Sequence, residues 1–337
     1  MRPRLLGYAL LGLGVLAALF YVAVGFGSRA GALELAARWP AELLGGAAGL
    51  DRDVLLYLRL PRAVSAVIVG AALALSGMLL QGVTRNPLAD PYLLGISGGA
   101  GLFVVVLKAF SSGAEPWWLV PVVAFAGASC AAFVVVLLGR GGAGRLTAVG
   151  LILAGVVVNA LCAALMTFLL ARADPFRLRI TTLWLAGGLG VATWPQLALS
   201  GVLVAALYVT SRAEAHRLNA LALGSDGASY VGVEGSRLLL RAALSASLLA
   251  AIAVSVAGLL GYVGLLVPHL VRRLVGGDLR RSLFVGALGG ALLLLGADTL
   301  ARLVFAPEEL PTGVLTAILG CPVLLVLVRR ELRGAGA

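Results

Sequence analysis

The sequence has few charged residues and almost no lysine. Of its 337 residues, 12% are charged and 61% are hydrophobic, and Lys108 is the only lysine. Because a soluble domain is roughly 25% charged, this composition excludes a soluble protein and indicates a membrane protein. A P-loop needs a lysine shortly after glycine to reach the phosphates, whereas Lys108 follows Leu107. The chain therefore has no ATPase site of its own.

Histidine and cysteine are too scarce and too scattered to suggest a metal site. His216 and His269 lie far apart in the sequence, and no His-Glu-x-x-His motif occurs. The three cysteines, Cys130, Cys162 and Cys321, all lie inside apolar runs. This pattern excludes a disulfide framework and a cysteine-based metal site. We expect no metal ligand and no catalytic residue in this chain.

Positive charge exceeds negative charge, with 26 Lys and Arg against 15 Asp and Glu. The basic residues fall singly or in pairs between apolar runs, not along one stripe, so a nucleic-acid partner is not expected. Arginine-rich and arginine-poor connections alternate along the chain, which sets the orientation of a membrane protein in a bilayer. The alternation predicts an even number of spans with both termini in the cytoplasm.

About ten apolar runs are long enough to cross a bilayer, a few of them short or kinked. At this density of apolar residues only helices satisfy the backbone, because barrel strands would alternate polar and apolar residues. The predicted fold class is an all-α polytopic membrane protein, with one transmembrane domain over residues 1–337. The expected spans are Leu5–Phe26, Ala63–Val83, Tyr92–Phe110, Trp118–Leu138, Thr147–Leu170, Leu183–Leu207, Arg241–Leu259, Gly261–Leu274, Leu283–Val304 and Gly313–Val328.

The first run, Leu5–Phe26, has two interpretations. Ala30 and Ala32 offer a small-residue cleavage site, as in a secretory signal peptide. The run is longer than a signal-peptide core of about 7 to 15 residues, and it is long enough to cross about 30 Å of hydrocarbon. A retained helix is the preferred interpretation.

Asp298 is the only acidic residue well inside an apolar run. A carboxylate at membrane depth is what an ion-driven secondary transporter needs, so this class stays open as an alternative. Arg302 follows four residues later on the same helical face, and a local ion pair is the competing interpretation. A membrane-embedded enzyme is a further class, which turnover by the purified chain would reveal.

The longest non-apolar stretch runs from Ser211 to Arg237. Glycines divide it into pieces too short to span a membrane, and its scattered apolar residues would give short helices one apolar face. It forms either short helices lying against a cytoplasmic partner or a solvated loop.

Three segments together resemble the FecCD family of ABC-importer permeases, which carry iron-siderophores, haem or cobalamin. They are Leu58–Gly101, which contains GVTRNPLADPYLLGISGGAG, then Gly258–Arg281, which contains GYVGLLVPH, and Ala297–Arg330, which contains PTGVLTAILGCP. The likeness extends over nearly the whole chain. No motif separates siderophore, haem and cobalamin as cargo.

The resemblance implies the permease subunit of a type II ABC importer, with ten helices per subunit, in the bacterial inner membrane. It implies four kinds of partner: a second copy of the chain, two ATP-binding cassette subunits, a periplasmic substrate-binding protein and membrane lipid. ATP and magnesium would then be held by the cassette subunits, and this chain would hold no cofactor.

The resemblance also implies residue roles. In such importers the loop after the sixth span forms short coupling helices that sit in a groove of the ATPase, and LNALALGSDGASYVGVEG is the matching stretch. This family often has an acidic residue directly after the Leu-Gly pair, whereas Ser225 stands here, followed by Asp226. The implied coupling residues are Leu221, Leu223, Gly224, Asp226, Ala228 and Gly232.

Arg59 and Arg62 lie three residues apart, on one helical face, at an outer end where positive charge is disfavoured. The resemblance implies that they and Arg302 meet glutamates on the substrate-binding protein. Contact with lipid phosphate, or pairing with Asp51 or Asp53, is the alternative.

By resemblance only, the path is lined from the spans Thr147–Leu170 and Leu283–Val304 and from the loop Gly139–Leu146. Within the first of these spans, Asn159, Met166 and Thr167 face either the cargo or a neighbouring helix, and their spacing does not decide between the two.

Overall fold

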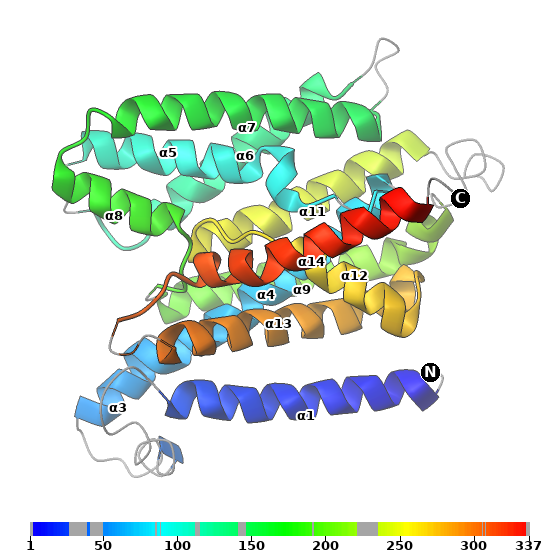
Figure 1. Cartoon of the computed structure of the whole chain (residues 1–337), viewed down its shortest axis with the longest axis horizontal. Coiled ribbons are helices and arrows are strands. Elements are labelled where there is room, and N and C mark those ends of the chain that lie inside the picture. The colour runs from blue at the N-terminus through cyan, green and yellow to red at the C-terminus, as the bar shows by residue number, and fades with distance from the viewer. Residues whose placement is uncertain are drawn as a thin grey trace.

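The computed structural model is helical throughout its described part. It describes residues 3–26, 39–40, 50–84, 86–87, 89–111, 115–140, 146–190, 192–220, 235–304, 306 and 308–334. Within these ranges every regular element is a helix (Figure 1). The elements are α1 (Pro3–Gly25), α3 (Leu50–Val54), η1 (Leu55–Arg59), α4 (Leu60–Thr84), η2 (Pro91–Leu94), α5 (Ile96–Phe110), α6 (Leu119–Leu138), α7 (Ala148–Leu170), α8 (Pro175–Leu185), α9 (Trp194–Ala220), α11 (Gly235–Ala257), α12 (Val263–Val275), α13 (Leu279–Leu303) and α14 (Thr312–Gly334).

Seven helices of the described part are long and apolar enough to cross a membrane. Two shorter apolar helices, Ile96–Phe110 and Thr312–Val326, accompany them. The predicted all-helical membrane class is confirmed, and the number of ten spans stays a prediction. Figure 1 shows that α1 begins and α14 ends at the same end of the bundle, as an even number of crossings requires.

One expected span is wrong. The run Leu183–Leu207 is not a single helix, because α8 ends at Leu185 and α9 begins only at Trp194. Gly187 turns the chain between them with a φ of 72°, and a Cβ at this position would overlap the carbonyl oxygen of Leu259. Only glycine fits both constraints.

The structure also differs from the prediction at the start of the expected coupling segment. Residues 211–220 are not short helices, since they are the last turns of the continuous helix α9. The predicted coupling residues, Leu221, Leu223, Gly224, Asp226, Ala228 and Gly232, lie outside the described residues. Their role stays a prediction.

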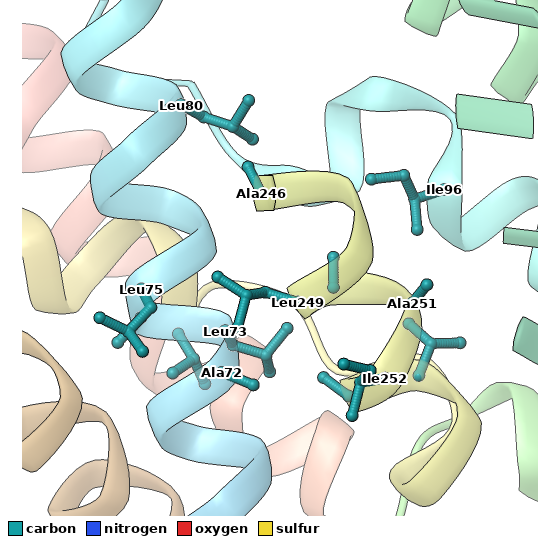
Figure 2. Packing of buried hydrophobic residues seen from close by; sticks show 14 of the residues in the cluster. Ala72, Leu73, Leu75, Leu80, Ile96, Ala246, Leu249, Ala251 and Ile252 are labelled. Atoms are coloured by element: carbon teal, nitrogen blue, oxygen red, sulfur yellow. The ribbon is translucent and has the colours of Figure 1, made fainter. Parts of the chain in front are cut away.

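Helix α4 runs through the middle of the bundle and is buried along most of its length. It is apolar around its whole circumference, which is the pattern of a helix surrounded by other helices. Figure 2 shows its leucines and alanines packed against α11, with Ala246, Leu249 and Ile252 facing Leu73 and Leu80 across the interface. Helix α13 packs on another side of α4.

The contact between α4 and α13 depends on two glycines. A Cβ on Gly70 would overlap the carbonyl oxygen of Gly290, and a Cβ on Gly290 would overlap that of Gly70. Small residues allow membrane helices to approach until their backbones touch, as the glycine-rich sequence predicts.

Helices α5 and α12 begin part of the way along their longer neighbours. The side chain of Asn159, which is midway along α7, donates from Nδ2 to the carbonyl oxygen of Tyr92 at 2.8 Å and accepts from the Gly98 N–H at 3.2 Å. The start of α12 at Gly264 touches α4 at Gly77. Each of the two short helices follows a residue in the left-handed region, Gly95 before α5 and Tyr262 before α12. Both irregular turns therefore lie inside the bundle, where protein must satisfy their backbone groups.

Candidate functional site

A cluster of charged side chains joins the start of α4 to the end of α13. Asp298 is fully buried, and its carboxylate accepts hydrogen bonds from Arg62 Nε at 3.1 Å and Nη2 at 2.9 Å. Arg302 Nε lies 3.1 Å from the same carboxylate, and Thr312 Oγ1 donates to it at 2.9 Å. A buried carboxylate is tolerable because cations and hydrogen bonds surround it.

Arg59 and Arg302 also hold the end of α1. Arg59 Nη1 donates to the carbonyl oxygen of Gly25 at 2.6 Å, and Arg302 Nη2 donates to that of Ala23 at 3.0 Å. The last carbonyl groups of a helix have no partner within the helix and carry partial negative charge, so guanidinium groups satisfy them well. These two arginines thus fasten the first span to the core.

Of the three predicted docking arginines, Arg62 has the most accessible side chain. Arg59 and Arg302 are 9% and 4% exposed as whole residues, whereas the Arg62 side chain is 20% exposed. Arg62 Nη1 also donates to the exposed Glu309 at 2.6 Å, so its charge is shared between two carboxylates. The docking role of the three arginines stays a prediction.

The cluster also bears on the ion-driven alternative. The predicted pair of Asp298 and Arg302 is confirmed, and Arg62 adds a second cation that spacing along one helix did not indicate. A carboxylate bound by two guanidinium groups is a poor site for a travelling ion, because the ion would have to displace them. Asp298 therefore no longer supports an ion-driven secondary transporter.

A cavity of about 520 Å³ lies where the two irregular turns meet. Asp90, which precedes η2, accepts a hydrogen bond from the Tyr92 N–H at 2.9 Å and another from the Tyr262 N–H before α12. One carboxyl group thus ties the start of η2 to the turn that precedes α12. The cavity is lined by Asp90, Tyr92, Leu185, Leu259, Gly261, Tyr262, Leu265, Gly313, Ala317 and Leu324.

The three predicted path residues lie near this cavity or on the flank of α7. Asn159 holds the backbone of Tyr92, which lines the cavity, so it acts there as a support. Met166 packs on Gly101 of α5, and the exposed Thr167 donates to the Ala163 carbonyl oxygen within α7. None of the three is among the residues that line the cavity in the described part of the chain. Their contact with cargo stays a prediction.

At the other end of the bundle a clamp joins α9 to α13. Asn219, in the last turn of α9, donates from Nδ2 to Asp278 Oδ1 at 2.7 Å and accepts from the Leu279 N–H at 3.0 Å. Asp278 is at the same time the N-cap of α13, with its carboxylate accepting from the Arg280 N–H at 3.0 Å. Because α9 leads directly into residues 221–234, the clamp connects the predicted coupling segment to the core.

Comparison with known proteins identifies the family. A family model described as the FecCD transport family matches residues 10–330. The chain belongs to the FecCD transport family.

Three curated relatives of this FecCD chain are permease proteins of transport systems. The hemin transport system permease HmuU of Yersinia pestis is 42% identical over 279 residues, which cover 82% of this chain and 83% of HmuU. The ferric enterobactin permease FepD of Escherichia coli is 37% identical and covers 94% of both chains. The vitamin B12 permease BtuC of Klebsiella pneumoniae is 38% identical and covers 83% of both.

A solved structure supports the fold of this FecCD chain. It is an inward-facing conformation of a metal-chelate type ABC transporter, similar with a TM-score of 0.81 at 28% identity, covering 96% of this chain and 99% of its own. The arrangement of the helices is thus shared along nearly the whole length of both chains.

The sequence marks Asp90 as part of the charged turn between two apolar runs, but it does not indicate the contact of Asp90 with Tyr262. Asp278 was not recognised as a functional residue, although an aspartate just before an apolar run is the pattern of a helix N-cap. Asn219 lay in the stretch assigned to the coupling segment. Tyr262 gave no signal, because a tyrosine in an apolar run reads as a packing residue.

Proposed function

We propose that this chain is the permease subunit of a binding-protein-dependent ABC importer that carries a metal chelate into the cell. The observation that carries the proposal is the family match over residues 10–330, together with relatives named for hemin, ferric enterobactin and vitamin B12. These cargoes share one chemical form, a metal ion enclosed in an organic chelator.

The finer assembly is part of the same proposal. The working unit is a homodimer in the bacterial inner membrane, with both termini in the cytoplasm, two ATP-binding cassette subunits that hold ATP and magnesium, and a periplasmic substrate-binding protein. Closure of the cassette dimer moves the segment 221–234. The clamp between Asn219 and Asp278 passes this movement to α13.

Docking of the substrate-binding protein is assigned to the outer end of the bundle, at Arg62. This side chain is partly exposed and already pairs with the exposed Glu309, so an acidic residue of a partner meets a cation here. Exposed ion pairs of this kind steer association and fix register more than they add affinity. Arg59 and Arg302 support the docking surface by holding α1 beneath it.

The docking assignment is tested with Arg62→Gln and, as the control, Arg62→Lys in the purified complex. We expect Arg62→Gln to slow association of the binding protein and to flatten its salt dependence, because one steering charge is lost. Arg62→Lys keeps the charge and retains the salt dependence. Identical association rates and salt slopes for wild type and Arg62→Gln would remove Arg62 from the docking surface.

The transport assignment is tested by co-purification. The chain should bring down a cassette ATPase, and hydrolysis of ATP by the complex should accelerate when chelate-loaded binding protein is added. Uptake by the chain alone, driven by a proton or sodium gradient, would instead support a secondary transporter.

A further inference from the structure

A second cavity, the inner cavity, lies where four helices meet at the end of the bundle opposite the charge cluster. It has a volume of about 250 Å³ and is bounded by the last turns of α4, α9 and α12 and by the start of α13. A water molecule takes up about 30 Å³ of the liquid, so this volume suits a small polar group with a few waters. The lining includes Gln81, Leu218, Asn219, Arg272, Leu279 and Ser282.

Gln81 is the residue that indicates a ligand in the inner cavity. It is 3% exposed, and its Nε2 donates to the carbonyl oxygens of Ala89 at 3.1 Å and Gly264 at 3.3 Å. These two acceptors fix the orientation of the amide, so its other atom is the acceptor Oε1. Among the residues that the structure describes, none donates a hydrogen bond to this buried Oε1. Since an unpaired buried acceptor is unfavourable, the group that completes it must carry a donor.

The charges around the inner cavity favour an anion. Arg272 lines it, and the segment Arg272–Arg281, with the sequence RRLVGGDLRR, carries four arginines and one aspartate. The carboxylate of this Asp278 is already engaged, because it caps α13 and its Oδ2 lies 3.5 Å from Arg281 Nε. Ser282 adds a buried hydroxyl that can donate or accept. The cavity thus offers a guanidinium and a hydroxyl to the oxygens of an anion.

The inner cavity opens away from lipid. Pro268 and Arg272 line it from one side of α12. The exposed Leu270 and Leu274 each follow two residues later, which is about 200° round the helix and therefore on the opposite side. Gly277, which also lines the cavity, is exposed between the end of α12 and the start of α13. This position favours a soluble anion over a lipid headgroup.

The requirement for a donor distinguishes among soluble oxyanions. Inorganic phosphate keeps at least one O–H throughout the neutral pH range, beside its charged oxygens. Sulfate has nearly the same shape and has no O–H. A phosphate monoester loses its last O–H with a pKa of about 6. Inorganic phosphate is therefore the common oxyanion that brings both the charge for Arg272 and the donor for Gln81.

We propose that the inner cavity binds inorganic phosphate, with Arg272 and Ser282 at its charged oxygens and Gln81 accepting a hydrogen bond from its O–H. Asn219, which joins α9 to α13, lines the same cavity, so bound phosphate contacts the inner ends of all four helices. Phosphate is also a product of ATP hydrolysis, which the proposed function assigns to subunits at this end of the bundle. The site itself does not depend on that function.

The test is equilibrium dialysis of radiolabelled inorganic phosphate against the full chain in nanodiscs of phosphatidylcholine, whose headgroup has no hydrogen-bond donor. We expect saturable binding that sulfate displaces at least about tenfold less effectively than unlabelled phosphate, because sulfate leaves Gln81 Oε1 unpaired. Methyl phosphate at slightly alkaline pH should compete as poorly as sulfate, since it has then lost its O–H. This comparison needs no substitution, so it holds even where a variant fails to fold.

Arg272→Gln is the variant that removes the cationic group of the cavity, and we expect it to bind phosphate at least about tenfold more weakly. Arg273→Gln is the matched control. It removes the same charge from the next residue, which is exposed and is not among the residues that line the cavity in the described part of the chain. Its affinity for phosphate should stay within about twofold of wild type.

Three results would overturn the proposal. The first is the absence of saturable phosphate binding, which would leave the cavity to water. The second is equal displacement by sulfate and phosphate, or an equal loss in Arg272→Gln and Arg273→Gln, which would show attraction by surface charge alone. The third is loss of phosphate binding in nanodiscs of phosphatidylglycerol but not of phosphatidylmethanol, which has the same charge and no headgroup hydroxyl. That result would assign the cavity to a lipid headgroup.

Discussion

Asp298 is the residue on which the outer end of the bundle depends. It is fully buried, and the guanidinium groups of Arg62 and Arg302 both approach its carboxylate within about the length of a hydrogen bond. A buried charge cluster contributes little net stability while it is complete, but removal of one member leaves the others buried without compensation. The hydrogen bond from Arg302 to the end of α1 depends on the same balance of charges in the cluster.

We predict that Asp298→Asn destabilises the folded protein by about 3–5 kcal/mol, because two buried guanidinium groups then lose their shared counter-charge. The measurement is the apparent melting temperature in detergent, followed by tryptophan fluorescence. Glu309→Gln is the control, since Glu309 pairs with the same Arg62 at the exposed edge of the cluster and a surface pair contributes about 0–1 kcal/mol. Equal melting temperatures for the two variants would refute the central role of Asp298.

At this scale the sequence could predict only contacts within one helix. The pair of Asp298 and Arg302 follows from a spacing of four residues. The contact of Arg62 with Asp298 joins two helices far apart in the chain, and the bonds of Arg59 to α1 are to backbone carbonyls. Neither contact leaves a pattern in a single sequence, and for that reason the sequence alone favours arginines that face outward.

Among the helices, the closest contact is that of α4 with α13 at Gly70 and Gly290. The neighbours of Gly290 are backbone atoms of Gly70 and the Cβ of Ala74, which cannot turn aside as the end of a flexible side chain can. Any added side-chain atom must therefore separate the two helices.

We predict that Gly290→Ala destabilises the protein by about 1–3 kcal/mol, which is typical of an overpacked interior. Gly14→Ala is the matched control, because Gly14 is also within a helix but a Cβ there has no neighbour within 4 Å. Both substitutions favour helix formation equally, so the difference in melting temperature isolates the contact. A Gly290→Ala protein that melts at or above the temperature of the control would contradict this packing.

The clamp at the end of α9 leads to a prediction about coupling. In Asn219→Ala both hydrogen bonds to the start of α13 are lost, so we expect fewer chelate molecules transported per ATP hydrolysed. Thr210→Ala, on the same helix, is the control, since its hydroxyl donates only to the Leu207 carbonyl oxygen within α9. The ratio is measured in proteoliposomes. The clamp has no role in coupling if both variants keep the wild-type ratio.

Apolar runs predicted most helices well, because burial in lipid demands long apolar segments whatever their neighbours are. The expected run Trp118–Leu138 became α6 and Thr147–Leu170 became α7, each within a residue or two. The failures have a physical reason. The break between α8 and α9 depends on one left-handed glycine, and residues 211–220 continue α9 although they are polar, since a helix can extend beyond the membrane.

Across the whole molecule, α13 connects the two ends that the proposed function requires. Its N-cap Asp278 receives the clamp from α9, and its last turns carry Asp298 and Arg302 of the charge cluster. Between these ends it packs against α4, which touches α12 beside the cavity at Gly77. For the proposed coupling movement, α9, α13, α4 and α12 thus form a continuous packed route to the cavity at Tyr262 and to the proposed docking surface.

The most direct test of the transport assignment is uptake by the chain reconstituted with its ATPase and substrate-binding protein in proteoliposomes. We predict accumulation of the metal chelate that requires ATP and loaded binding protein and persists when ionophores abolish the proton and sodium gradients. Accumulation that requires a gradient and proceeds without the ATPase would contradict the assignment.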